Sequence, residues 1–119
     1  MNTDGYPDEQ ELERIRTWPL IEASDFDSLM GYIRERWVYA ETGYWAQRES
    51  VYRLATGGWS GNETIIQAMR GNGVFWGICF LASISGGLYL FCTNPSSSRL
   101  AHALLQALQI ATRWPLNST

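Results

Sequence analysis

The sequence predicts an α+β fold, a single domain over residues 1–119 in which helices pack on a small antiparallel sheet. Three observations predict this class. A length of 119 residues is enough for one core but not for two ordinary domains. Apolar residues recur at three- and four-residue steps in several segments, as in amphipathic helices. An uncharged aromatic stretch interrupted by paired glycines indicates a β-hairpin.

The N-terminal residues divide into a loose start and a helical segment. Residues 1–7 contain Asp4, Gly5 and Pro7, and we expect them to be flexible. Residues 8–18 have helical propensity and end before Pro19, which cannot continue a helix.

The next segment predicts a helix at about 25–42. Its apolar positions lie on one helical face: Phe26, Leu29, Met30, Ile33, Trp37 and Ala40. Ser24 followed by the acidic Asp27 indicates an N-cap, and Gly43 is a natural C-terminal stop.

Residues 44–56 are ambiguous between a continued helix and a strand. The alternation in Val51–Leu54, which leads directly into glycines, favours a third strand at about 50–56.

The glycine-rich stretch at 57–63 joins this strand to a second helix. Ser60 and Glu63 have the spacing of a capping box and predict a helix at about 61–70. Gly57 and Gly58 are expected to supply the backbone angles of a tight turn, with Trp59 as a packing anchor.

Residues 74–92 contain no charged side chain and are long enough for a membrane helix. The turn signal Ser85-Gly86-Gly87 and the aromatic and β-branched content instead predict a hairpin, so membrane insertion through 71–92 is the less favoured alternative. A two-residue turn would place Cys79 opposite Cys92. Both hairpin faces would then be apolar and need cover, either from the chain's own helices or from another chain, which predicts a homodimer or an obligate partner.

The last predicted helix spans about 97–114. Its polar side chains form one narrow stripe, so it should bury most of its circumference: Arg99, His102, Gln106, Gln109 and Arg113.

The charge pattern argues against a nucleic-acid partner, because the net charge is −3 and the pI about 5.0. All 12 carboxylates lie in residues 1–63, where six arginines leave a net charge of −6 (6 − 12). The acidic N-terminus has no apolar signal segment, which predicts a cytoplasmic protein with Cys79 and Cys92 as reduced thiols.

No catalytic, metal or cofactor site is predicted. Gly58–Asn62 is one residue short of a G-x-S-x-G nucleophile elbow, but the one histidine, His102, lies on the expected solvent stripe of a helix. The same glycine loop could hold a small ligand or an anion, although the chain has no lysine to support phosphate binding.

An interaction surface fits the composition better than an enzyme. The chain has six tryptophans and six tyrosines, and aromatic residues and arginine dominate protein interfaces. The candidate partner-binding residues combine the acidic N-terminal half with aromatic residues of the hairpin: Asp25, Asp27, Glu35, Glu41, Trp76 and Tyr89.

The segment Thr56–Glu63 (TGGWSGNE), followed by an apolar helix, Phe75-Trp76 and the pattern Gly86-Gly87-x-Tyr89-x-Phe91, resembles a family of small, mostly uncharacterised phage and prophage proteins. The resemblance covers about residues 50–92. It implies no known reaction, but it implies an accessory protein of a phage or mobile element. Such proteins often block a host protein, so the resemblance implies protein–protein binding in the bacterial cytoplasm, including anti-CRISPR-like inhibition of a defence system.

Overall fold

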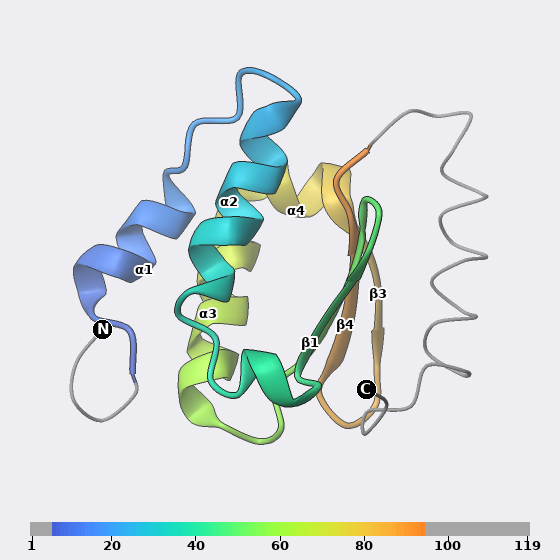
Figure 1. Cartoon of the computed structure of the whole chain (residues 1–119). Helices are drawn as coiled ribbons and strands as arrows, with labels where there is room; N and C mark the ends of the chain where they lie inside the picture. Colours follow the sequence, from blue (N-terminus) through green and yellow to red (C-terminus); the bar gives the residue numbers. More distant parts are fainter. Residues whose placement is uncertain (1–5, 95–119) are drawn as a thin grey trace.

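The structure, a computed structural model, describes residues 6–94 (Figure 1). In chain order its elements are α1 (Glu9–Arg16), α2 (Ser24–Arg34), the 3-10 helix η1 (Ala40–Thr42), β1 (Trp45–Arg48), β2 (Val51–Ala55), α3 (Ser60–Gly71), α4 (Gly73–Cys79), β3 (Phe80–Ile84) and β4 (Leu88–Cys92). The helix predicted at 97–114 lies outside the described residues, as do residues 1–5 of the predicted flexible start.

The predicted α+β class is confirmed. Four antiparallel strands form a sheet in the order β1-β2-β4-β3, and the described helices lie on one of its faces (Figure 1). The predicted third strand is β2, which pairs with β4 from Val51↔Cys92 to Ala55↔Leu88. Strand β1, which the sequence pattern did not predict, pairs with the other edge of β2. The ambiguous residues 44–56 therefore form a hairpin, with no continuation of the helix.

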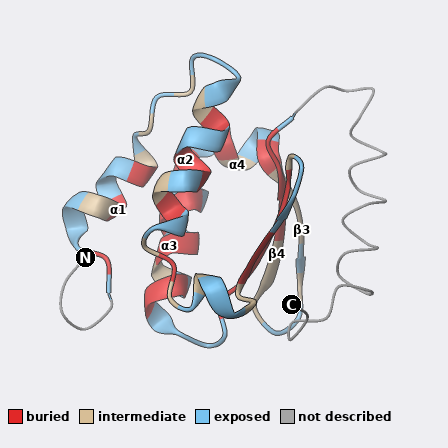
Figure 2. Cartoon of the chain, in the orientation of Figure 1, coloured by how far each residue is buried: buried red, intermediate tan, exposed pale blue. Residues whose placement is uncertain are grey.

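The main core lies between the helices and the sheet, where buried residues follow the inner sides of α2 and α3 (Figure 2). Its largest members that are almost fully removed from solvent are Ile15, Leu29, Met30, Ile33, Leu54, Ile65, Ile66, Met69, Phe75 and Phe91. Burying one such side chain contributes about 1.5–3 kcal/mol. This core therefore fixes how the helices are oriented on the sheet.

The opposite face of the sheet is apolar as well. Val51, Leu90 and Cys92 are 0–4% exposed and form a second cluster, with Leu81 and Ile84 packed against it. The expectation of two apolar sheet faces is thus met in strands β2, β3 and β4.

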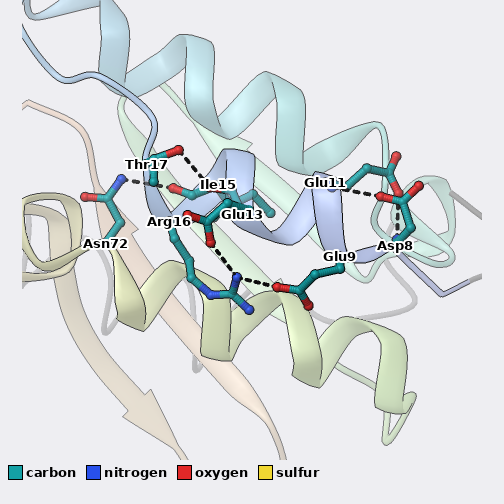
Figure 3. Close-up of polar contacts among 8 residues, drawn as sticks. All are labelled: Asp8, Glu9, Glu11, Glu13, Ile15, Arg16, Thr17 and Asn72. Carbon is teal, nitrogen blue, oxygen red and sulfur yellow. Dashed lines mark hydrogen bonds and ion pairs between the residues drawn. The ribbon is translucent and has the colours of Figure 1, made fainter.

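Helix α1 begins with a capping box (Figure 3). The Asp8 carboxylate accepts from the Glu11 N–H at 2.8 Å, and the Glu11 carboxylate accepts from the Asp8 N–H at 2.9 Å. These two bonds satisfy backbone donors that a helix start otherwise leaves open. The preceding Pro7 is buried and the Tyr6 hydroxyl bonds to Ser60, so the last two residues of the predicted flexible start are held in place.

The other end of α1 is tied to the junction of α3 and α4. The buried Asn72 side chain donates to the Ile15 carbonyl at 3.0 Å (Figure 3) and accepts from the Phe75 N–H at 3.2 Å, which caps α4. Arg16 pairs with Glu9 and Glu13, both at 2.9 Å, on the exposed side of α1. One buried amide thus joins the first helix to the fourth.

Helix α2 is shorter than the predicted 25–42, because it ends at Arg34 and the chain turns before η1. Its start also differs, since Ser24 is the first helical residue and makes no side-chain cap. The Asp25 carboxylate accepts instead from the N–H groups of Ile21 and Glu22, at 2.9 and 2.8 Å, and so fixes the loop that precedes the helix. The early end follows from a hydrogen bond between Val38 and Asn62 of α3, 24 residues apart in the sequence, which is described below.

The prediction of a strand from residue 74 is wrong, because residues 73–79 form α4. The Asn72 cap starts this helix, and Phe75 and Cys79, four residues apart, both point into the core. The hairpin is therefore limited to residues 80–92.

The predicted pairing of Cys79 with Cys92 is also wrong. Cys79 is the last residue of α4 and lies outside the ladder, because β3 begins at Phe80, which pairs with Phe91. Ile84 pairs with Leu88, so the turn has three residues, 85–87, and the register shifts between Phe80 and Ala82. The two thiols belong to different clusters on the two sides of the sheet.

Candidate functional site

The helix η1 lies beside the start of α3 at one end of the molecule (Figure 1). Two large aromatic rings are exposed there. Tyr39 is 51% exposed and Trp59 45% exposed, and their ring centroids lie 5.3 Å apart. The ring of Tyr44 packs against that of Tyr39 in a T-shaped arrangement, with centroids 5.8 Å apart. Tyr6, 44% exposed, bonds through its hydroxyl to Ser60, next to Trp59, at 2.6 Å. We call the exposed rings of Tyr6, Tyr39 and Trp59 the aromatic surface.

The backbone of Tyr39 is strained. Its φ of 59° and ψ of 31° place it in the left-handed region, which costs a residue with a side chain about 1–2 kcal/mol. Among residues 6–94 only Glu49, in the β1-β2 turn, shares a positive φ without being glycine. A bulky residue held in this region indicates that its surroundings fix the conformation.

Asn62 is the residue that fixes it. The Asn62 side chain is 0% exposed, accepts from the Val38 N–H at 2.8 Å and donates to the Val38 carbonyl at 3.2 Å. It also donates to the Thr56 carbonyl at 3.4 Å. The amide therefore holds the residue before Tyr39 against the start of α3, which prevents α2 from continuing.

The glycine loop before α3 completes this junction. Gly57 and Gly58 have φ values of 62° and 77°, and a Cβ on Gly57 would overlap the ring of Tyr44. The Thr56 N–H donates to the Gly87 carbonyl at 2.9 Å, which joins the loop to the β3-β4 turn. Gly57 and Gly58 thus have the structural role that the sequence predicted.

Three other details of the loop correct the sequence analysis. The Ser60 side chain does not cap α3; it bonds instead to Tyr6. The Glu63 carboxylate accepts from the Thr56 hydroxyl at 3.4 Å, so the predicted capping box is wrong. Trp59 is not a buried anchor but an exposed ring.

An open cavity of about 460 Å³ adjoins the aromatic surface. It is lined by Arg34, Glu35, Trp37, Tyr39, Ala40, Glu41 and Thr42. The lining carries a formal charge of −1, from two carboxylates and one guanidinium. Two of the predicted partner-binding residues, Glu35 and Glu41, are therefore brought together beside Tyr39.

Asp25 and Asp27 lie at the other end of α2. The N–H groups of Glu22 and Ile21 lower the pKa of Asp25. Asp27 accepts at 2.7 Å from both the Tyr52 hydroxyl and the Thr93 hydroxyl, which connects α2 to the sheet. Burial, followed by the bond to Asp27, raises the pKa of Tyr52 well above its usual range. These two carboxylates serve the fold and do not join Glu35 and Glu41.

Trp76 and Tyr89 are partly buried against the main core. The Trp76 ring stacks on Phe80 with centroids 4.5 Å apart, and Arg70 covers it at 4.9 Å. Neither residue is among the large apolar side chains that the described part of the chain exposes. They are therefore weaker interface candidates than Tyr39 and Trp59.

The described residues show no arrangement typical of catalysis. Among residues 6–94 the Ser60 hydroxyl bonds to a tyrosine hydroxyl and to no carboxylate, and burial raises the pKa of the Cys79 thiol to about 12. Within residues 6–94 no three His, Cys, Asp or Glu side chains converge as metal ligands. The same residues contain no helix that is long and apolar enough to cross a membrane, and segment 71–92 is divided between α4, β3 and β4.

Comparison with protein-family models found no match, and neither did comparisons with curated proteins and with solved structures. The assignment of the candidate site consequently rests on its geometry.

The sequence analysis did not identify Tyr39 or Asn62 as site residues. Asn62 belongs to the TGGWSGNE motif, and its place three and four residues before Ile65 and Ile66, on the apolar face of α3, was a usable signal of a buried polar residue. Nothing local marks Tyr39, because its exposure and backbone angles depend on that distant amide.

Proposed function

We propose that this chain is a non-enzymatic protein that acts by binding another protein through the aromatic surface. The observation that carries the proposal is the strained, clamped presentation of Tyr39 beside Trp59. Exposing two such rings loses the burial energy that a core position would provide, and aromatic side chains are the commonest energetic centres of protein interfaces. Of the six large apolar side chains that the described residues expose, three lie on this surface.

The context is also a proposal. The resemblance of residues 50–92 to small phage and prophage proteins supports an accessory protein that acts in the cytoplasm of a bacterial host. We propose a host protein or complex as the partner, and inhibition of a defence system, in the manner of an anti-CRISPR protein, as the effect. The acidic N-terminal half supports competition for a basic groove of the target.

The test uses the full chain, immobilised and exposed to bacterial lysate. A protein that the wild type retains should be lost with Trp59→Ala and with Tyr39→Ala. Ile21→Ala is the matched control, because Ile21 is the most exposed of the large apolar residues, at 85%, and is not part of the aromatic surface. Equal retention by all four proteins would exclude the aromatic surface as the binding site.

The proposal that the acidic residues compete with nucleic acid for a basic groove of the target needs its own test. Asp25 and Asp27 are separated from Glu35 and Glu41 by the length of α2, about 16 Å for 11 residues. Neutralising Glu35 and Glu41 together should weaken binding to the retained partner, whereas Asp25→Asn with Asp27→Asn should act mainly on stability. Unchanged binding after all four substitutions would remove this version.

The homodimer predicted from the apolar hairpin faces is a separate proposal. Light scattering should give twice the chain mass of 13.5 kDa. A monomer over the accessible concentration range would contradict it.

The alternative of a small ligand or anion at Gly57–Glu63 predicts a defined activity that Ser60→Ala abolishes. No contact in the described residues favours this alternative, because Thr56 already accepts from the Trp59 N–H at 3.0 Å.

A further inference from the structure

Three partly buried aromatic rings in the described chain are each covered by an arginine of the same chain. The guanidinium carbons lie 3.5 Å from the centroid of Tyr32 (Arg36), 4.7 Å from Trp18 (Arg14) and 4.9 Å from Trp76 (Arg70). A guanidinium is planar and weakly hydrated, so it stacks on an aromatic face with little loss of hydration. Arginine thus covers three of the rings that the core does not fully enclose.

The two rings of the aromatic surface that contact each other have no such cover. Between residues 6 and 94 no arginine lies over Tyr39 or Trp59, although both are more exposed than the three covered rings. Their tilted arrangement, with an interplanar angle of 57°, leaves ring surface open to solvent.

The electrostatics beside these rings favour a cation. Glu35 and Glu41 line the adjoining cavity, and Glu63 lies in the first turn of α3, four residues after Trp59. Arg34 is the one cation in the cavity lining, so these four groups sum to −2. Glu41 forms no ion pair within the described residues, and the one ion pair of Glu35, with Arg36, is long at 3.4 Å.

We propose that the aromatic surface receives an arginine side chain of the partner protein. The guanidinium would stack on the ring of Trp59 and contact Tyr39 at its side, and its N–H groups would donate to the carboxylates of Glu35 and Glu41. Lysine fits less well, because a compact ammonium cannot stack on a ring and bind a carboxylate along its edge in the same plane. The inference rests on the proposed function and names the chemistry of the partner at that same site.

The test titrates the full ¹⁵N-labelled chain with the peptide acetyl-Gly-Arg-Gly-Arg-Gly-amide. The control peptide carries citrulline, an uncharged isostere, at both arginine positions. We expect the arginine peptide to shift the backbone amides of Tyr39 and Glu41 and the indole N–H of Trp59, with an apparent Kd at least about fivefold below that of the citrulline peptide.

Matched variants assign the interaction to its atoms. Glu41→Gln and Trp59→Leu should each remove the preference for arginine, whereas Trp59→Phe keeps a ring and should retain most of it. Glu13→Gln, a neutralised carboxylate on α1, should change nothing. Unchanged resonances elsewhere show that each variant is folded, since Glu41 and Trp59 are exposed.

Two results would overturn the inference. One is equal Kd values for the two peptides, and the other is amide shifts of equal size at all the acidic residues of α1 and α2. The proposed function can fail or survive independently of it. If Trp59→Ala abolishes capture of a partner while Glu35→Gln and Glu41→Gln do not, the aromatic surface is still the binding site, but the inference that it receives an arginine is wrong.

Discussion

Replacing Asn62 with alanine should destabilise the protein and release the loop that presents Tyr39. The substitution leaves the Val38 N–H and carbonyl without the bonds of 2.8 and 3.2 Å that they make to the buried amide, and removes the longer bond to the Thr56 carbonyl. A buried polar group left without a partner costs about 1–3 kcal/mol. Val38 is half-buried, so water can replace part of the loss, and we expect a decrease in unfolding free energy of about 2–3 kcal/mol.

The assay is urea unfolding followed by tryptophan fluorescence. With a slope of about 1–3 kcal/mol per molar urea, the midpoint should fall by about 0.7–3 M. Hydrogen exchange should show faster exchange of the Val38 amide, because its acceptor is lost. Gln67→Ala on the exposed side of α3 is the control and should stay within about 0.5 kcal/mol of the wild type.

A result within the error of this control would refute the reasoning that Asn62 holds the loop. So would a destabilised Asn62→Ala chain in which the exchange of the Val38 amide is unchanged, because the loss would then come from elsewhere in α3.

The other predictions concern the glycine loop, the thiols and the alkaline range. Gly57→Ala should cost more unfolding free energy than Gly58→Ala: both positions require a left-handed backbone, worth about 1–2 kcal/mol, but only at Gly57 does a Cβ meet the ring of Tyr44. Equal losses in urea unfolding would contradict this. The Cys79 thiol should resist iodoacetamide at pH 8 in the native protein, because it is 0% exposed and its pKa is about 12, and rapid native labelling would show that α4 opens. Unfolding free energy should fall as the pH rises above about 9, because the folded pKa values of Cys79 and Tyr52 are raised and the unfolded chain loses those protons first. Cys79→Ala and Tyr52→Phe should each reduce this slope between pH 8 and pH 11, and an unchanged slope would contradict the assignment.

The parts of the fold that could be predicted are those in which local pattern and tertiary contacts agree. The alternation in residues 51–54 predicted a strand, and these residues lie in the central strand β2, although all five of its residues are buried. Residues 60–71 carry an apolar face that α3 turns to the core. In both segments the neighbours along the chain carry the information.

The segment for which the strand prediction was wrong shows the opposite case. Residues 73–79 are rich in strand-forming side chains, yet they are helical because Asn72 caps them while bonding to Ile15, 57 residues away. The site residue Tyr39 was not predicted for the same reason, since its exposure is set by Asn62, 23 residues further along the chain. A single sequence read by spacing cannot show a bond between residues so far apart along the chain.

The edges of the sheet limit how copies of this chain can associate. Among the described strands, β1 and β3 are the outer ones. Strand β1 presents the exposed Gln47 and Arg48, and β3 is irregular between Phe80 and Ala82, so neither offers the straight apolar edge on which a strand of another copy could extend the ladder. Assembly by strand addition is thereby disfavoured at both ends of the sheet. Any self-association should therefore occur through contacts between side chains. Such contacts respond to salt and to changes in apolar side chains, whereas fibres grow through backbone hydrogen bonds.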